Sequence, residues 1–341
     1  MSSAAGGACL PRAAALCLLA GCLALFGCGE PKEPELWIYT SIYREVLDKL
    51  APQAQAAMAG VKLRWYKAGS EEVAARITAE LASGQTPADI LMTADPFWYQ
   101  ALKEEGLLRP YRPPEASRVP PALTDPEGAY LTSRAAVMVI GYNAQVFSAD
   151  QAPETFAELT QPRWQGKVVI GDPLKSGTAL ATVAMLSNKL GWDYFKALRA
   201  SDVVVEGGNS AVLRRIETGD RPVGVLLLEN LLKARENRSP VEIVYPRDGA
   251  VVIPSPIAIV AGTDQPVAAE RFVRFVMSPE GQRAMVEGYM YPADPGIAGP
   301  KGSAPFTRLL AMGRCLDTKF VREMTAERET LKETFGQIMF E

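Results

Sequence analysis

Short apolar segments alternate with amphipathic helical segments along most of this sequence, and this alternation constrains the fold more than any other feature. Residues 36–39 are typical of a strand, and the polar turn Thr40–Ser41 then leads into a helical spacing of apolar residues. The same pattern recurs at 61–66 and 73–81, before a third strand at 88–93. Such alternation predicts an α/β fold with mostly parallel sheets flanked by helices.

The pattern resumes beyond a proline-rich stretch at 110–126. Further strands and helices are predicted at 135–141, 167–170, 179–190, 192–198, 203–205, 211–218, 223–228, 241–245 and 250–260. The two long strands near residues 135 and 255 predict two lobes joined by a two-stranded hinge. We assign residues 36–134 and 255–341 to lobe 1, which is discontinuous, and residues 135–254 to lobe 2.

Residues 1–27 have the layout of a lipoprotein signal peptide. The segment 1–12 carries one positive charge and no negative charge, and 13–26 form an uninterrupted apolar run. A helix that spans a membrane needs roughly 20 apolar residues, so this run is too short and is typical of an export signal instead.

Two cysteines near the end of this segment are candidates for lipidation. Leu25–Cys28 has the Leu-x-Gly-Cys form of a bacterial lipobox, and Leu19–Cys22 matches it as well. We favour Cys28, because residues 28–35 then form a polar tether to the first strand, and keep Cys22 as the alternative. Acyl chains on either cysteine would anchor the protein to a membrane without spanning it. A plain cleaved signal peptide is the remaining interpretation.

Composition excludes several classes of function. The chain has no histidine among its 341 residues, which removes Ser-His-Asp and Cys-His nucleophiles and histidine-bearing zinc sites. Only Cys315 lies outside the N-terminal segment, so no disulfide framework is expected. The formal net charge of −3 recruits neither nucleic acid nor an anionic membrane surface. We therefore expect no metal, no cofactor and no nucleic-acid partner.

Three turns at predicted strand ends are rich in hydroxyl, amide and glycine groups. In open parallel sheets, ligands bind beyond the carboxyl ends of the strands, where helices begin. Helix N-termini present backbone N–H groups and a partial positive charge there, so these turns predict a site for a compact anion. Ordinary helix capping is the alternative for each turn. The candidate residues are Thr40, Ser41, Ser176, Gly177, Thr178, Asn209 and Ser210.

Two acids also follow predicted strands, Asp95 after the third and Glu229 after the apolar run 223–228. A carboxylate near an anion site is unfavourable unless the ligand brings hydrogen-bond donors. This pairing predicts a ligand with one anionic end and one hydroxyl or amino end; helix capping is again the alternative. Tyr43, Trp98 and Tyr291 are candidates for the walls of the site, although Trp98 is equally compatible with the core.

Several segments together resemble a known family. They are Ile38–Ser41, Ala88–Leu91, Pro173–Thr178, Gly208–Ser210 and Ala268–Gln282. The chain is similar through them to bacterial extracellular solute-binding proteins of the ferric-iron-binding type, a branch that also includes receptors for sugar phosphates, phosphoglycerate and aminoethylphosphonate. The resemblance implies a two-lobed periplasmic-binding-protein fold of type II that closes on one ligand.

The resemblance also bears on the ligand. Where iron-binding members carry a histidine or acid, a glutamate and a tyrosine pair, this chain has Tyr43, Ala94 and Glu229–Asn230. The positions at which that family holds an anion remain suitable. This comparison points to a small anionic organic solute, such as a sugar phosphate or phosphonate, in place of iron. A receptor for ferric or another hard metal, with Asp95, Glu229 and Tyr43 as ligands, and a carboxylate-dependent enzyme remain alternatives.

The resemblance finally implies a role. We expect a non-enzymatic, lipid-anchored and monomeric substrate-binding component of an ABC importer, exported to the periplasm or cell surface. Its partners are an inner-membrane permease with its ATPase, and a sensor role for the closed form stays open. Membrane contact is expected through the lipid anchor only.

Overall fold

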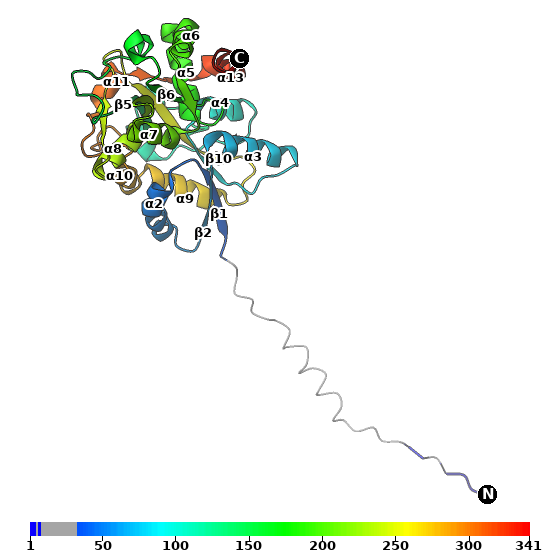
Figure 1. Cartoon of the computed structure of the whole chain (residues 1–341). Coiled ribbons are helices and arrows are strands. Elements are labelled where there is room, and N and C mark those ends of the chain that lie inside the picture. Colours follow the sequence, from blue (N-terminus) through cyan, green and yellow to red (C-terminus); the bar gives the residue numbers. More distant parts are fainter. Residues whose placement is uncertain (5, 8–32) are drawn as a thin grey trace. The chain divides into compact units, whose positions relative to one another are not determined.

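The computed structural model describes residues 1–4, 6, 7 and 33–341. The chain divides into two compact units, Met1–Pro34 and Glu35–Glu341, and the fold described below is that of the second (Figure 1). The predicted apolar run 13–26 and both candidate lipidation sites, Cys22 and Cys28, lie outside the described residues. Within the part of the chain that is described, no helix is both long and apolar enough to cross a membrane.

A single twelve-stranded sheet runs through the second unit. Its main path has the order β2-β1-β3-β10-β5-β8-β6-β7, with β4 and β12 paired to β10, and β9 and β11 paired to β5. The strands are β1 (Glu35–Thr40), β2 (Lys62–Lys67), β3 (Ile90–Met92), β4 (Leu108–Arg109), β5 (Leu131–Asn143), β6 (Val168–Gly171), β7 (Val204–Glu206), β8 (Val223–Leu227), β9 (Val241–Val244), β10 (Val251–Val260), β11 (Tyr291–Pro292) and β12 (Arg314–Cys315).

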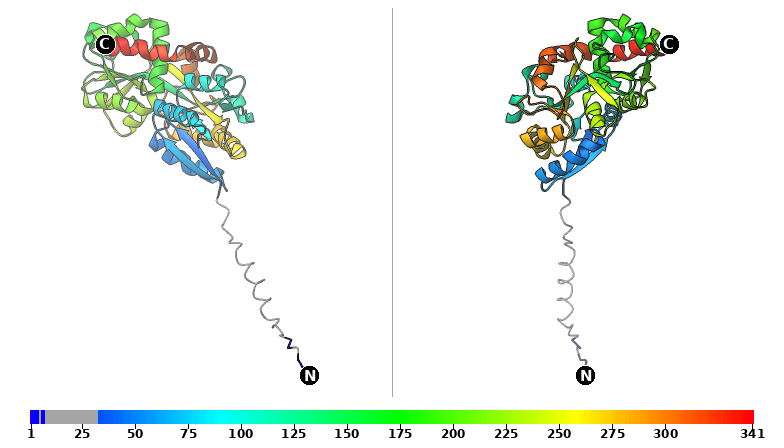
Figure 2. Two further views of the ribbon diagram at one scale, coloured as in Figure 1. Left: turned by 90° about the vertical axis from the view of Figure 1, so that its right-hand side faces the viewer. Right: turned by 60° about the vertical axis from the view of Figure 1, so that its left-hand side comes forward.

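Helices flank this sheet, as the sequence periodicity predicts (Figures 1 and 2). The α-helices are α2 (Arg44–Ala57), α3 (Ser70–Ala82), α4 (Pro96–Glu104), α5 (Gly177–Leu190), α6 (Trp192–Ala200), α7 (Asn209–Thr218), α8 (Leu228–Glu236), α9 (Pro266–Met277), α10 (Pro279–Glu287), α11 (Phe306–Met312), α12 (Thr318–Thr325) and α13 (Arg328–Phe340). Short 3-10 helices occupy Pro114–Arg118, Pro121–Leu123, Ala157–Thr160 and Pro162–Trp164.

The sheet consists of two parallel halves joined by an antiparallel centre. Strand β1 pairs in parallel with β2 and β3, and β6 pairs in parallel with β7 and β8. The long strands β5 and β10 lie between these halves and run antiparallel to each other and to their outer neighbours. We call the β1–β3 half with its helices the first lobe and the β6–β8 half the second lobe. The predicted fold class, a two-lobed α/β protein with a two-stranded hinge, is confirmed.

The hinge strands are buried along their whole length and carry apolar runs, which explains why the sequence pattern identifies them. Their register shifts between Ser255 and Pro256, where proline cannot donate to the ladder. The sheet therefore bends at its centre, between the two lobes.

The C-terminal helices lie differently from the prediction that assigned all of 255–341 to lobe 1. Helix α12 contacts α4 of the first lobe, whereas α13 contacts α5 and α6 of the second lobe (Figures 1 and 2). Leu331, Phe335 and Met339 form one apolar face of α13 and join the core of the second lobe. Sequence periodicity shows that α13 has such a face but not which lobe the face meets. The other lobe boundaries stay predictions.

Candidate functional site

A cavity of about 330 Å³ lies between the two lobes, and we call it the basic chamber. Three cationic side chains line it, and none of its described lining residues is acidic. Arg134 is buried, while Lys175 and Arg214 are exposed at the rim. The electrostatic character of the chamber therefore favours an anion. Its lining residues are Ser41, Tyr43, Gly69, Ser70, Ala94, Arg134, Lys175, Ser176, Thr178, Gly208, Asn209, Ser210, Ala211, Arg214 and Leu227.

Three helices begin at this chamber, namely α3, α5 and α7. Their N-cap residues are Gly69, Ser176 and Gly208. The Ser176 hydroxyl accepts a hydrogen bond from Ala179 N of its own helix, so capping accounts for part of its role. The two glycines have no side chain with which to cap, which leaves first-turn amides of α3 and α7 without a side-chain acceptor. Such amides are suited to bind anionic oxygen atoms.

Hydrogen bonds fix the polar side chains at the floor of the basic chamber. The Asn209 amide Nδ2 donates to Thr178 Oγ1 over 3.0 Å, and its Oδ1 accepts from Leu227 N at 3.1 Å. The hydroxyls of Ser176 and Thr178 lie 3.1 Å apart and share a hydrogen bond. Ser176, Thr178 and Asn209 are all buried. These groups are thus oriented by the protein itself and need little rearrangement to bind a ligand.

Six of the predicted site residues meet in this chamber: Ser41, Tyr43, Ser176, Thr178, Asn209 and Ser210. Gly177 lies behind it, where a Cβ would be 2.8 Å from Asp95 Cβ. Thr40 does not line it, because its hydroxyl donates to Met92 O at 2.8 Å and accepts from Ile42 N at 3.1 Å. These two residues shape the turns and contribute no lining atom.

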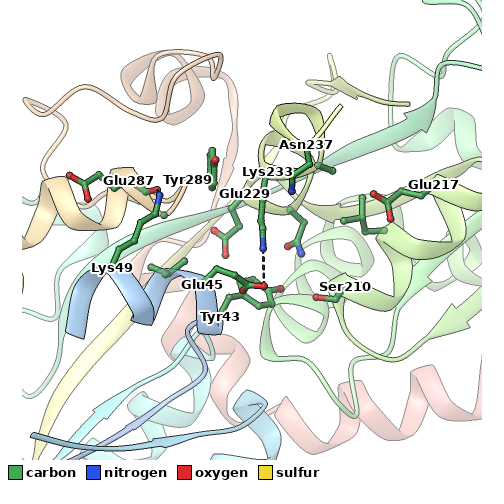
Figure 3. A pocket seen from close by; sticks show the side chains of 15 residues that line it. Tyr43, Glu45, Lys49, Ser210, Glu217, Glu229, Lys233, Asn237, Glu287 and Tyr289 are labelled. Atoms are coloured by element: carbon green, nitrogen blue, oxygen red, sulfur yellow. Dashed lines mark hydrogen bonds and ion pairs between the residues drawn. The ribbon is translucent and has the colours of Figure 1, made fainter. Parts of the chain in front are cut away.

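A second cavity of about 380 Å³ adjoins the first and shares Tyr43 and Ser210 with it (Figure 3). We call it the acidic chamber, since glutamates outnumber lysines in its lining. Lys233 forms an ion pair with Glu45, Nζ to Oε1 at 2.8 Å, across this chamber. Its charged lining residues are Glu45, Lys49, Glu217, Glu229, Lys233 and Glu287.

A buried ion pair connects the two chambers. Arg134 Nη1 of the basic chamber donates to Glu229 Oε2 of the acidic chamber over 3.3 Å, and both side chains are at most 5 % exposed. Burial raises the pKa of Glu229, and the Arg134 charge opposes that shift. Within the described chain, Glu229 Oε1 and Asn230 Oδ1 are buried acceptors without a hydrogen-bond partner. Unpaired buried acceptors are unfavourable, so both call for a donor.

Tyr43 lies beside these groups as a neutral donor. Burial, followed by the nearby Glu229 charge, raises the pKa of the Tyr43 phenol far above its ordinary value. Without a bound cation, the neutral phenol is therefore the favoured form of Tyr43. Among residues 33–341, no group of three or more His, Cys, Asp or Glu side chains is arranged to hold a metal ion.

Asp95, a predicted ligand contact, caps a helix and forms an ion pair instead. Its Oδ1 accepts hydrogen bonds from Phe97 N and Trp98 N at 3.1 and 3.2 Å and so caps helix α4, ahead of Pro96. Its Oδ2 pairs with Arg328 at 2.8 Å. The side chain is buried and lines neither chamber, which matches the helix-capping alternative.

The predicted wall residues Trp98 and Tyr291 also lie away from both chambers. Trp98 belongs to an apolar cluster and meets Tyr99 edge to face, with ring centroids 5.4 Å apart. The Tyr291 ring stacks on Phe306 at 5.3 Å, and its hydroxyl donates to Ala304 O at 2.6 Å. Both aromatic rings are satisfied by burial in the core.

Sequence reasoning missed the three cations of the basic chamber. Arg134 has a recognisable signal, because an arginine inside the apolar strand β5 is rarely buried without a specific partner. Lys175 precedes the predicted turn by one residue, and Arg214 lies one helical turn beyond Ser210, on the same face of α7.

Comparison with known proteins identifies a family for this chain. The family model for "Bacterial extracellular solute-binding protein" matches residues 85–305. A probable ABC transporter periplasmic-binding protein of Sinorhizobium fredii is 28 % identical over 66 % of this chain, and the match spans 64 % of that relative, slightly under two thirds. A putative 2-aminoethylphosphonate-binding periplasmic protein of Salmonella typhimurium is 25 % identical over 67 % of this chain and 68 % of that protein.

Two further matches extend over more of the chain. The major ferric iron-binding protein of Neisseria meningitidis is 24 % identical over 82 % of this chain and 87 % of its own length. Among solved structures, the periplasmic binding protein AfuA of Actinobacillus pleuropneumoniae, with fructose-6-phosphate bound, has a TM-score of 0.79. It is 24 % identical, and the match covers 90 % of this chain and 99 % of AfuA. The likeness to AfuA shows a shared fold.

Proposed function

Because this chain belongs to the family of bacterial extracellular solute-binding proteins, we propose that it is the substrate-binding component of an ABC importer and captures a small anionic organic solute. The single observation that carries this proposal is the basic chamber. Three cations and the first turns of three helices surround it, and none of its described lining residues is acidic. This arrangement suits the oxygen atoms of a phosphate, phosphonate or similar group.

The same proposal assigns the rest of the ligand to the acidic chamber. Glu229 Oε1 and Asn230 Oδ1 need donors, and they adjoin the basic chamber through Tyr43 and Arg134. An amino or hydroxyl group beside the anionic group would supply them. The names of two similar proteins, which refer to 2-aminoethylphosphonate and fructose-6-phosphate, describe molecules of this type. They support the ligand class and do not select one compound.

Export and anchoring complete the proposal. Relatives in this family are periplasmic or extracellular, which supports export. We propose that a lipid on Cys28, or alternatively on Cys22, holds a monomer at the membrane, where it delivers its ligand to the permease and its ATPase. The family consists of solute-binding proteins, in keeping with a role that is not enzymatic.

Mass spectrometry of the ligand released from protein that was purified without refolding tests this function. A thermal-shift panel then compares sugar phosphates, aminoalkylphosphonates and carboxylates. The true ligand class should increase the free energy of unfolding by RT ln(1 + [L]/Kd) and so raise the melting temperature. Elemental analysis of the same sample provides the opposing outcome. A stoichiometric metal that survives dialysis, with no response to any organic anion, would replace the proposal by a metal receptor.

A further inference from the structure

Helix α13 carries two cationic side chains, Arg328 and Lys332, that meet two carboxylates at the starts of other helices. Arg328 Nη2 lies 2.8 Å from Asp95 Oδ2 and 2.8 Å from Glu71 Oε2. Lys332 Nζ lies 2.6 Å from the same Glu71 oxygen. We call these four residues the C-terminal clasp. One turn of helix separates the two cations, so both face the same site.

The clasp is shielded from solvent. The Asp95 side chain is 1 % exposed, and those of Glu71, Arg328 and Lys332 are 14, 14 and 12 % exposed. The remaining partner, Glu329, is exposed and pairs with both Arg328 and Lys332. Ion pairs at such depth are screened much less by salt than surface pairs. Removal of one partner leaves a buried charge without compensation.

The clasp joins the two lobes. Its carboxylates belong to the first lobe, because Glu71 is in the first turn of α3 and Asp95 caps α4. Its cations belong to α13, whose Phe335 ring packs on Phe195 of α6 with centroids 5.7 Å apart. The four ionic groups thus tie the first lobe to a helix that packs with the second lobe.

The clasp also adjoins the basic chamber without lining it. Ser70 and Ala94 line the chamber, and each directly precedes a clasp carboxylate in the sequence. Without their cations, Glu71 and Asp95 would place two negative charges behind this wall and repel an anion. The clasp therefore neutralises the wall and holds it against the second lobe.

We propose that Arg328 and Lys332 are positioning residues for ligand binding, which stabilise the closed arrangement of the lobes through Glu71 and Asp95 without contacting the ligand. The effect on affinity rests on the proposed function, whereas the effect on lobe closure does not. When the lobes separate, α13 stays with the second lobe through its apolar face and the clasp breaks.

The test compares the double variant Arg328→Gln/Lys332→Gln with the matched control Arg322→Gln. Arg322 is a cation on the adjacent helix α12, and its described hydrogen bond stays within that helix, to Thr318 O. The first measurement is the interlobe distance without ligand, by electron paramagnetic resonance between spin labels at the exposed positions 62 and 196, in a Cys28→Ser/Cys315→Ser background of the chain from residue 28. We expect the double variant to shift toward longer distances and the control to match the parent.

The second measurement is calorimetric titration with inorganic phosphate. We expect affinity to fall by about tenfold or more in the double variant, within the usual range for conformational coupling. Arg328→Lys keeps the charge but lacks the second nitrogen with which Arg328 contacts Asp95, so its affinity should lie between those of the parent and the double variant. Circular dichroism verifies that each variant is folded.

The outcomes separate the two proposals. If the parent protein binds neither phosphate nor any organic anion, the proposed function fails, and the distance measurement still tests the clasp. An unchanged distance distribution in the folded double variant would overturn the clasp, whatever the affinity. If the double variant fails to fold, the same comparison is made with Glu71→Gln. This variant removes the ion pairs of Glu71 with Arg328 and Lys332 but leaves the Asp95–Arg328 pair.

Discussion

Thr178 connects the side chains at the floor of the basic chamber, and a single methyl-for-hydroxyl exchange tests its role. Thr178→Val keeps the shape but removes the oxygen that bonds Ser176 and Asn209. We expect phosphate affinity to fall by about tenfold, since a lost hydrogen bond in a buried site costs about 1–3 kcal/mol. Calorimetric titration measures this loss.

Thr182 provides the matched control for that variant. It lies one turn further along α5, is buried, and its hydroxyl donates to Thr178 O at 2.7 Å, but it does not line the chamber. Thr182→Val should bind phosphate as tightly as the parent protein does. Its free energy of unfolding should fall by about as much as that of Thr178→Val. Equal affinity losses in the two variants would assign the effect to helix α5 and not to the site.

The Arg134–Glu229 pair makes a second prediction at the residue scale. Arg134→Met leaves the Glu229 carboxylate buried beside Asn230 without its cation, and breaking a buried pair costs about 3–5 kcal/mol. The double variant Arg134→Met/Glu229→Met removes both charges and should be less destabilised than Arg134→Met alone. Urea denaturation of the parent, both single variants and the double variant gives the coupling energy. A purely additive result would contradict the pairing.

Single residues also show where sequence reasoning succeeds and fails. Ser176, Thr178 and Asn209 are predictable, because their types and their positions after strands are local properties of the chain. Asp95 and Glu229 follow strands in the same way, yet one caps a helix and the other faces a chamber. The difference depends on Arg328 and Arg134, which are distant in sequence from the acids that they pair with. No local pattern contains that information.

At the scale of elements, the start of helix α5 lies so close to the start of α4 that only glycine fits there. A Cβ on Gly177 would be 2.8 Å from Asp95 Cβ and 3.0 Å from Ala94 O. Gly177→Ala should therefore wedge the two helices apart, with a loss of about 1–3 kcal/mol in unfolding free energy. Thermal and urea unfolding measure this loss.

Gly208 is a suitable control for packing at a helix start. It also precedes a helix at the chamber, but a Cβ there meets no atom within 4 Å, and its φ is −100°. Gly208→Ala should change stability by less than about 1 kcal/mol. If the two variants are equally stable, the close approach of α5 and α4 does not contribute to the fold.

The elements themselves are largely predictable, and their partners are not. Apolar runs identify β5 and β10 because buried central strands are continuous in hydrophobicity. The apolar face of α13 is equally visible in the sequence, but its packing on α5 and α6 is a contact between segments far apart in the chain. Helix periodicity predicts that a face is buried and leaves its partner undetermined.

At the scale of the whole molecule, two groups of ion pairs among residues 33–341 connect the lobes, and they differ in depth. The C-terminal clasp is shielded from solvent, whereas the Glu45–Lys233 pair at the acidic chamber has side chains 59 and 38 % exposed. Exposed pairs contribute about 0–1 kcal/mol and are screened by salt. The C-terminal clasp should therefore contribute more to lobe closure than the Glu45–Lys233 pair does.

This asymmetry leads to a prediction about salt and charge. Lys233→Gln should change the ligand-free interlobe distance little and phosphate affinity by less than about fivefold, because the exposed pair contributes at most about 1 kcal/mol. A rise from 0.15 M to 1 M salt reduces the Debye length from about 8 Å to about 3 Å. In the parent protein, the spin-label distance should persist through that rise, since the buried clasp is poorly screened. A distance that lengthens with salt in the parent, but not in Lys233→Gln, would instead assign closure to the exposed pair.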